Sequence, residues 1–157
     1  MKFSDDFYDV YGNLKIATVF GVLCAVCSAF ASVFDVGAAY IFISILIGNI
    51  LALKVDGIHH FVTLVLFVLV LLIFGCPLLD ISILIIGICA ALFDEIGHEL
   101  IPNLTNNSFL LFFFEYRFVM KVVILLMAIS GVFSFWTFIL FIIFELSYVM
   151  ADMFVNG

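Results

Sequence analysis

The chain has 157 residues, of which 68% are hydrophobic and 11% are charged, and its formal net charge is −7. A soluble domain could not cover this much apolar surface with so few polar residues. The composition excludes an ordinary soluble domain and predicts an all-α integral membrane protein. At this length we expect residues 1–157 to form a single transmembrane helical domain.

The amino-terminal segment is acidic, with Asp5, Asp6 and Asp9 ahead of the first apolar run. A signal peptide carries positive charge at this place, and its apolar region is shorter than the run that follows. We therefore expect this segment to be part of the mature protein.

Four apolar runs come next, each close to the length of about 20 residues that one membrane crossing needs. Pro102 is expected to stop the fourth run, because proline cannot continue a helix. Asp80, close to Pro77, is expected to form the tight turn between the third and fourth runs. The predicted spans cover residues 16–34, 37–53, 61–79 and 81–100.

The last apolar stretch, residues 109–154, is about twice as long as one crossing requires. Its Ser and Gly residues between Ser130 and Trp136 favour a break there, which gives a helical hairpin and six spans. The alternative is a single span over residues 122–144, which gives five spans. We favour the bundle of about six transmembrane helices.

The basic residues predict the orientation of this bundle. With six spans they all fall on or near one face of the membrane, so the positive-inside rule places both termini in the cytoplasm. These residues are Lys2, Lys15, Lys54, Arg117 and Lys121.

The segment LFDEIGHEL, residues 92–100, carries ionisable groups near the end of the fourth span. Asp94, Glu95 and His98 would lie below the membrane surface, where a charged side chain costs several kcal/mol unless it faces a partner or water. Spacings of three and four residues place them on one helix face. Glu95 and His98 also have the Glu-x-x-His spacing that binds a carboxylate and an imidazole to one metal.

Other helices supply matching groups. Asp56 and His59 repeat the acid-x-x-His spacing, His60 follows directly, and lone acids stand at Glu115 and Glu145. The inventory is similar to that of carboxylate-bridged two-metal bundles, although the order of the ligands differs. The predicted metal ligands are Asp56, His59, Asp94, Glu95, His98 and Glu115, and the predicted catalytic carboxylates are Glu95, Glu115 and Glu145.

These residues predict a membrane enzyme with a divalent metal near the cytoplasmic face. Carboxylates outnumber histidines, which favours Mg, Mn or Fe over Zn. Lys54, Arg117 and Lys121 are expected to bind an anionic headgroup, and a lipid or isoprenoid-type substrate would enter from the bilayer. No basic patch predicts a nucleic-acid partner, and the sequence does not fix the oligomeric state.

Three alternatives accompany this prediction. The same carboxylates could serve a metal-ion or proton-coupled transporter, although few polar residues stand in the outer half of the spans. The protein could also be a non-catalytic membrane subunit with an ion-paired core, or the charged groups could simply lie at the membrane interface. The four cysteines are expected to act as small apolar residues.

Overall fold

The computed structural model describes the backbone of residues 2–9, 11–55 and 57–156, and their side chains except at 2, 3, 6, 9 and 151–156. Within these ranges, all regular secondary structure is α-helical, which confirms the predicted fold class at the level of an all-α protein. The elements are α1 (Lys2–Asp9), α2 (Leu14–Phe34), α3 (Val36–Leu51), α4 (Ile58–Phe74), α5 (Ile81–Leu104), α6 (Ser108–Glu115), α7 (Phe118–Ile129) and α8 (Phe135–Asn156).

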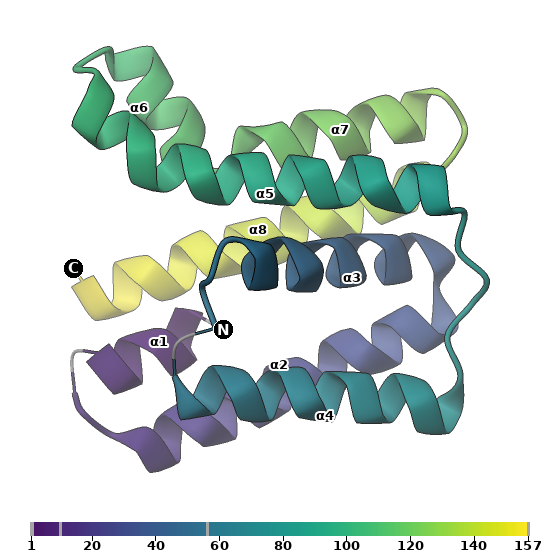
Figure 1. Ribbon diagram of the computed structural model, residues 1–157, viewed down its shortest axis with the longest axis horizontal. Coiled ribbons are helices and arrows are strands. Elements are labelled where there is room, and N and C mark those ends of the chain that lie inside the picture. Colours follow the sequence, from purple (N-terminus) through teal and green to yellow (C-terminus); the bar gives the residue numbers. More distant parts are fainter. Residues whose placement is uncertain (1, 10, 56, 157) are drawn as a thin grey trace.

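The long helices run up and down the molecule (Figure 1). Each of α2, α3, α4 and α5 reverses the direction of the helix before it, and α7 and α8 form a further antiparallel hairpin. The short helices α1 and α6 and the carboxy-terminal part of α8 lie at one end, which we call the terminal end. The α2–α3, α4–α5 and α7–α8 connections lie at the opposite end.

The four predicted runs correspond to α2, α3, α4 and α5, but two of the predicted ends are wrong. The helix α4 ends at Phe74 and not at residue 79, because Gly75 adopts a φ of 93° and Pro77 follows. The helix α5 continues past Pro102 to Leu104. In the last turn a proline removes only one backbone hydrogen bond, and the side chain of Asn103 donates to the Glu99 carbonyl at 3.0 Å.

The carboxy-terminal third contains two breaks, and only one was predicted. The predicted break falls between α7, which ends at Ile129, and α8, which begins at Phe135. The other break separates α6 from α7 at Tyr116 and Arg117, where Arg117 adopts a left-handed backbone with a φ of 51°. Only a few per cent of residues other than glycine adopt this conformation, so neighbouring contacts must hold it.

Within the described part of the chain, two helices, α2 and α5, are long and apolar enough to cross a membrane. The helices α3, α4 and α7 and the segment Phe135–Met150 are also apolar but shorter.

Small residues allow the helices to approach one another closely. A Cβ on Gly21 of α2 would lie 2.4 Å from the Thr63 hydroxyl of α4, and a Cβ on Gly48 of α3 would lie 2.8 Å from the Ala91 side chain of α5. Backbones that approach in this way gain van der Waals contact along their length. On α2 the buried residues are all small, and they repeat every three or four positions: Ala17, Gly21, Ala25, Ala29 and Ser32.

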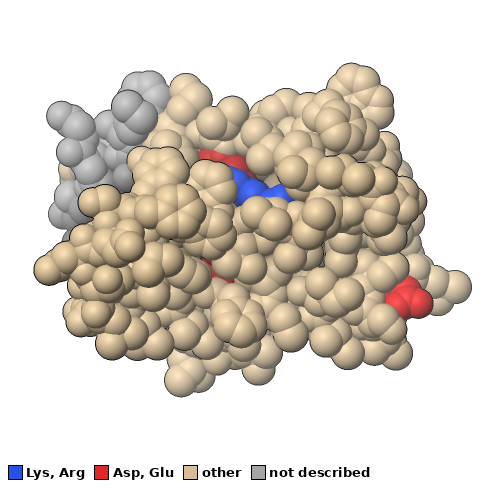
Figure 2. Space-filling view, turned by 90° about the horizontal axis from the view of Figure 1, so that it is seen from above, with Lys and Arg blue, Asp and Glu red and all other residues tan. Residues whose placement is uncertain are grey.

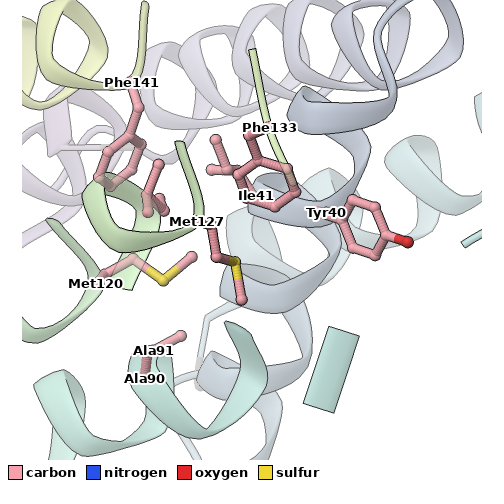
Figure 3. Packing of buried hydrophobic residues seen from close by; sticks show 9 residues of the cluster. Tyr40, Ile41, Ala90, Ala91, Met120, Met127, Phe133 and Phe141 are labelled. Atoms are coloured by element: carbon pink, nitrogen blue, oxygen red, sulfur yellow. The ribbon is translucent and has the colours of Figure 1, made fainter. Parts of the chain in front are cut away.

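Larger buried side chains fill the space between α3, α5, α7 and the α7–α8 hairpin (Figure 3). Tyr40 and Ile41 of α3 pack with Met120 and Met127 of α7 there. The ring of Phe133, in the α7–α8 turn, packs against the Tyr40 ring in a tilted arrangement. Methionine is unbranched and flexible, so it fills irregular gaps between helices. This packing fixes the start of α7 against α5, where the charged residues lie.

Candidate functional site

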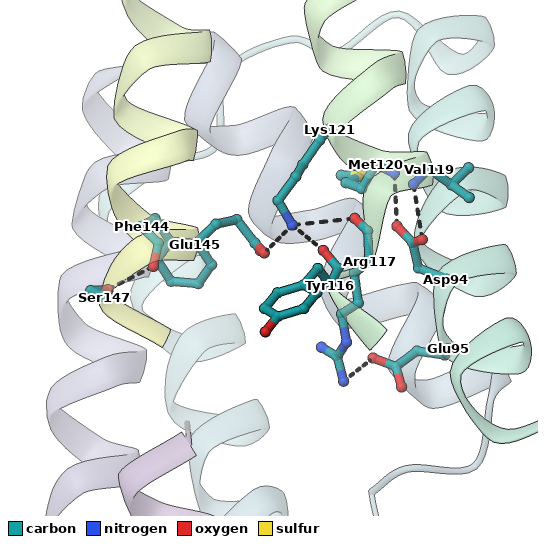
Figure 4. A network of polar contacts seen from close by, with 10 residues as sticks. All are labelled: Asp94, Glu95, Tyr116, Arg117, Val119, Met120, Lys121, Phe144, Glu145 and Ser147. Carbon is teal, nitrogen blue, oxygen red and sulfur yellow. Dashed lines mark hydrogen bonds and ion pairs between the residues drawn. The ribbon is translucent and has the colours of Figure 1, made fainter. Parts of the chain in front are cut away.

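Asp94 of α5 caps the amino terminus of α7. Its two carboxylate oxygens accept hydrogen bonds from the backbone N–H groups of Val119, at 3.0 Å, and Met120, at 2.7 Å (Figure 4). The first N–H groups of a helix have no partner within the helix, and a negative charge beside them is favourable. The buried Asp94 therefore acts as an N-cap supplied by a neighbouring helix.

Glu95, the next residue of α5, forms an ion pair with Arg117. The carboxylate and guanidinium are 2.9 Å apart, and the Glu95 side chain is only 6% exposed. The Arg117 guanidinium also lies over the ring of Tyr148, 5.4 Å from its centroid, in the geometry of a cation–π contact. These contacts link the α6–α7 break to α5 and α8.

Lys121 of α7 joins the same break to α8. Its ammonium group donates to Glu145 at 2.8 Å and to the backbone carbonyls of Tyr116 and Arg117. Both side chains of the Lys121–Glu145 pair are largely buried. We call these five paired residues the inner charged cluster: Asp94, Glu95, Arg117, Lys121 and Glu145.

A cavity of about 520 Å³ opens beside the inner charged cluster, between α2, α3, α5, α7 and α8. Its polar lining residues are Asp94, Glu95, Glu145 and Arg117 of the inner charged cluster, together with Asn49, Ser28, Ser147 and Tyr148. Aromatic and aliphatic side chains form much of the rest. This apolar part includes Phe20, Leu23, Phe42, Ile45 and Phe144, with Cys24 and Cys27 beside them.

A second cluster lies at the terminal end, between α1 and α4. We call Asp5, His59 and His60 the histidine cluster. The Asp5 Oδ1 atom lies 3.5 Å from His59 Nε2 and 3.4 Å from His60 Nε2, and the three candidate ligand atoms lie within 4.8 Å of one another. His59 is buried, with 2% of its surface exposed, and its ring packs against those of Tyr8 and His60.

Other predicted site residues form separate surface pairs. His98 Nδ1 lies 3.8 Å from Glu115 Oε2, and both side chains are at least one-third exposed. Lys54 pairs with Glu99, which is not among the predicted site residues. Asp56 lies outside the described residues.

Among the described residues, the predicted metal ligands lie in separate groups and do not meet at one centre. Asp94 and Glu95 belong to the inner charged cluster, His98 pairs with Glu115, and His59 belongs to the histidine cluster. Spacings of three and four residues predict which residues share one side of a helix, but they do not determine which neighbour each residue contacts.

The predicted substrate-binding cations are also engaged within the protein, since Lys54, Arg117 and Lys121 each pair with an acid. The sequence did not suggest two residues of the candidate sites: Tyr148, beside Arg117, and Asp5, beside His59 and His60. Tyr148 lies three residues after Glu145, one helical turn away, which is the signal that could have suggested it. The sequence carries no signal that Asp5 lies beside the distant His59.

Comparisons of the chain with protein-family models, with curated proteins and with solved structures find no match.

Proposed function

We propose that the protein is an integral membrane protein of six crossings that binds a lipid-like or isoprenoid-type molecule in the cavity beside the inner charged cluster. The observation that carries this proposal is the cavity itself, whose apolar wall meets buried charged groups. Its volume of about 520 Å³ is in the range of small-molecule binding sites.

The distribution of side-chain sizes supports the membrane location. Buried positions on α2 carry alanine, glycine and serine, whereas exposed positions carry large apolar residues such as Val19 and Phe34 on α2 or Phe93 on α5. Small residues at helix contacts and large apolar ones outside are typical of helices packed in lipid. In Figure 2 the face is almost uncharged, and red and blue atoms meet in one recess near its centre.

The charges support the same topology. Lys15 and Lys54 lie near the ends of α2 and α3 at the terminal end, and Arg117 and Lys121 lie at the start of α7, the end of that helix farther from the α7–α8 connection. At the opposite end, Asp35 and Asp80 cap α3 and α5. The positive-inside rule then favours the terminal end on the cytoplasmic side.

The pairing of the inner charged cluster refines the substrate class. The sequence alone favoured an anionic headgroup, but an anion would have to displace Glu95 from Arg117 or Glu145 from Lys121. Separating a buried ion pair is costly. A neutral headgroup with a hydroxyl can instead donate a hydrogen bond to a carboxylate lone pair while the ion pairs stay intact. We therefore favour a lipid or isoprenoid-type alcohol.

In an enzyme acting on such a substrate, Glu95 and Glu145 are the groups placed to exchange a proton with the headgroup, because both line the cavity. Glu115, the third predicted catalytic carboxylate, lies on the surface beside His98. For a lipid-modifying enzyme we therefore propose Glu95 and Glu145, and not Glu115, as the catalytic carboxylates.

Binding of labelled farnesol to the detergent-purified protein tests the proposal. Cys24→Trp places a large side chain into the cavity and should weaken binding at least tenfold, since the cavity volume is lost. Cys89→Trp is the matched control, because Cys89 is an exposed cysteine on α5 that does not line the cavity. Equal binding by the wild-type protein and Cys24→Trp would refute the proposal. Tighter binding of farnesyl phosphate than of farnesol would instead support the anionic headgroup predicted from the sequence.

A further inference from the structure

We propose that Asp5, His59 and His60 bind one divalent transition-metal ion, which joins α1 to α4 at the terminal end. This site is separate from the cavity, and the inference does not rest on the proposed function. None of the three residues lines the cavity.

The distances favour a shared metal over direct hydrogen bonds. The contacts from Asp5 to His59 and His60, at 3.5 and 3.4 Å, are longer than the usual limit of about 3.2 Å for an N–H to oxygen hydrogen bond. In a tetrahedral site with metal–ligand bonds of about 2.1 Å, neighbouring ligand atoms stand about 3.4 Å apart. The two contacts therefore have the length of edges of such a site.

The burial of His59 is the second observation. Its side chain is 3% exposed, and neither ring nitrogen makes a hydrogen bond within the described part of the chain. Most buried polar side-chain atoms have a partner, because leaving one without costs about 1–3 kcal/mol. A metal bound to Nε2 would provide that partner.

The surroundings hold the His59 ring in place. The Tyr8 ring lies 4.7 Å away, measured between centroids, and a Cβ on Gly57 would come within 2.5 Å of the His59 ring. Glycine at position 57 thus leaves the space that the imidazole occupies. A ligand held in this way loses little freedom when it binds an ion.

The donor set indicates the class of metal. Two imidazoles and one carboxylate suit zinc and iron, whereas magnesium and calcium prefer sites made of oxygen ligands. Three protein ligands also leave a coordination position open, as in catalytic rather than structural zinc sites. Zinc is therefore included among the metals we expect, in contrast to the preference drawn from the sequence.

The test uses the full chain, purified in detergent and treated with a chelator, with Zn²⁺, Co²⁺ and Mg²⁺ as probes. We expect one Zn²⁺ per chain by elemental analysis, a rise in melting temperature with Zn²⁺, and visible Co²⁺ absorption typical of tetrahedral coordination. Mg²⁺ should give none of these effects. His60→Ala and Asp5→Asn should each weaken Zn²⁺ binding at least tenfold.

His98→Ala is the matched control, because His98 is the remaining histidine of the chain and lies outside the cluster. It should bind Zn²⁺ like the wild-type protein. The proposal is overturned if the wild-type protein binds no Zn²⁺, or if His98→Ala loses as much affinity as His60→Ala. His60 is only partly buried, so the variant should fold, and its melting temperature without metal verifies this. If His60→Ala does not fold, the Zn²⁺ titration of the wild-type protein decides whether the metal site exists.

Discussion

The inner charged cluster and the histidine cluster both combine acidic and basic side chains, but they differ in how those groups are bonded. In the inner charged cluster, each carboxylate accepts from a cation or from backbone amides at 2.7–3.0 Å. In the histidine cluster, Asp5 lies 3.4 and 3.5 Å from two imidazoles, and the ring nitrogens of His59 make no hydrogen bond to any described group.

This difference separates two roles that look alike in the sequence. Ionisable groups that already bond one another stabilise a particular arrangement of helices, and a metal would have to break those bonds. The ring nitrogens of the buried His59 have no hydrogen-bond partner among the described residues, so they are available to bind an ion. We therefore assign the inner charged cluster to holding the α6–α7 break and shaping the cavity, and the histidine cluster to metal binding.

The largest effect is expected when the buried ion pair of the inner charged cluster is broken. Arg117→Met leaves Glu95 buried without its cation, which should lower the free energy of unfolding by about 3 kcal/mol. Unfolding in detergent micelles, followed by circular dichroism, measures this loss. Adding Glu95→Gln to Arg117→Met should recover part of it, because the stranded charge is then removed.

Lys54→Met is the matched control for Arg117→Met. The Lys54–Glu99 pair is an ion pair as well, but Glu99 is more than half exposed. Exposed pairs contribute less than about 1 kcal/mol, so this loss should be clearly smaller. Equal losses in the two variants would show that the Glu95–Arg117 pair does not hold the fold.

A smaller effect is expected when the cap on α7 is weakened. Asp94→Asn keeps one acceptor oxygen but turns an NH2 group toward a backbone N–H, which should cost about 1–2 kcal/mol. Hydrogen exchange should also become faster at the Met120 amide. Asp80→Asn is the control, because Asp80 caps α5 at an exposed position where asparagine serves equally well. Exchange at Met120 unchanged in Asp94→Asn would contradict the capping role.

The helices were predictable from the sequence because apolar runs and helix-ending residues are local signals. The apolar runs located α2 to α5, and Asp35 and Asp80 cap the helices that follow them. The end of α4 at Gly75 was not predicted, since the predicted run continued to residue 79. The break at Arg117 was not predictable, because its left-handed backbone accompanies contacts with residues far away in the sequence. These contacts are the Glu95 ion pair and the cap that Asp94 provides.

The candidate sites were predictable only as an inventory of residues. The sequence suggested that Asp94 and Glu95 need partners, since a charge inside the bundle is costly. It did not show that these partners are the start of α7 and Arg117, nor that Asp5 approaches His59 across 54 positions of the chain. Those contacts depend on how α1 packs near α4 and α7 near α5, which helical spacing does not determine.

The smallest effect is expected for His98→Ala, and it distinguishes the two clusters most directly. A metal centre built from Glu95, His98 and Glu115 would lose its ion when His98 is removed. The structure instead places His98 near Glu115 at 3.8 Å, in a partly exposed pair whose contribution to stability should be about 0.5 kcal/mol or less. Stability and Zn²⁺ content measured on the same His98→Ala sample should therefore both stay close to wild type. A loss of metal with little loss of stability would instead place the ion at the end of α5. The histidine cluster would then not be the metal site, and its assignment would be wrong.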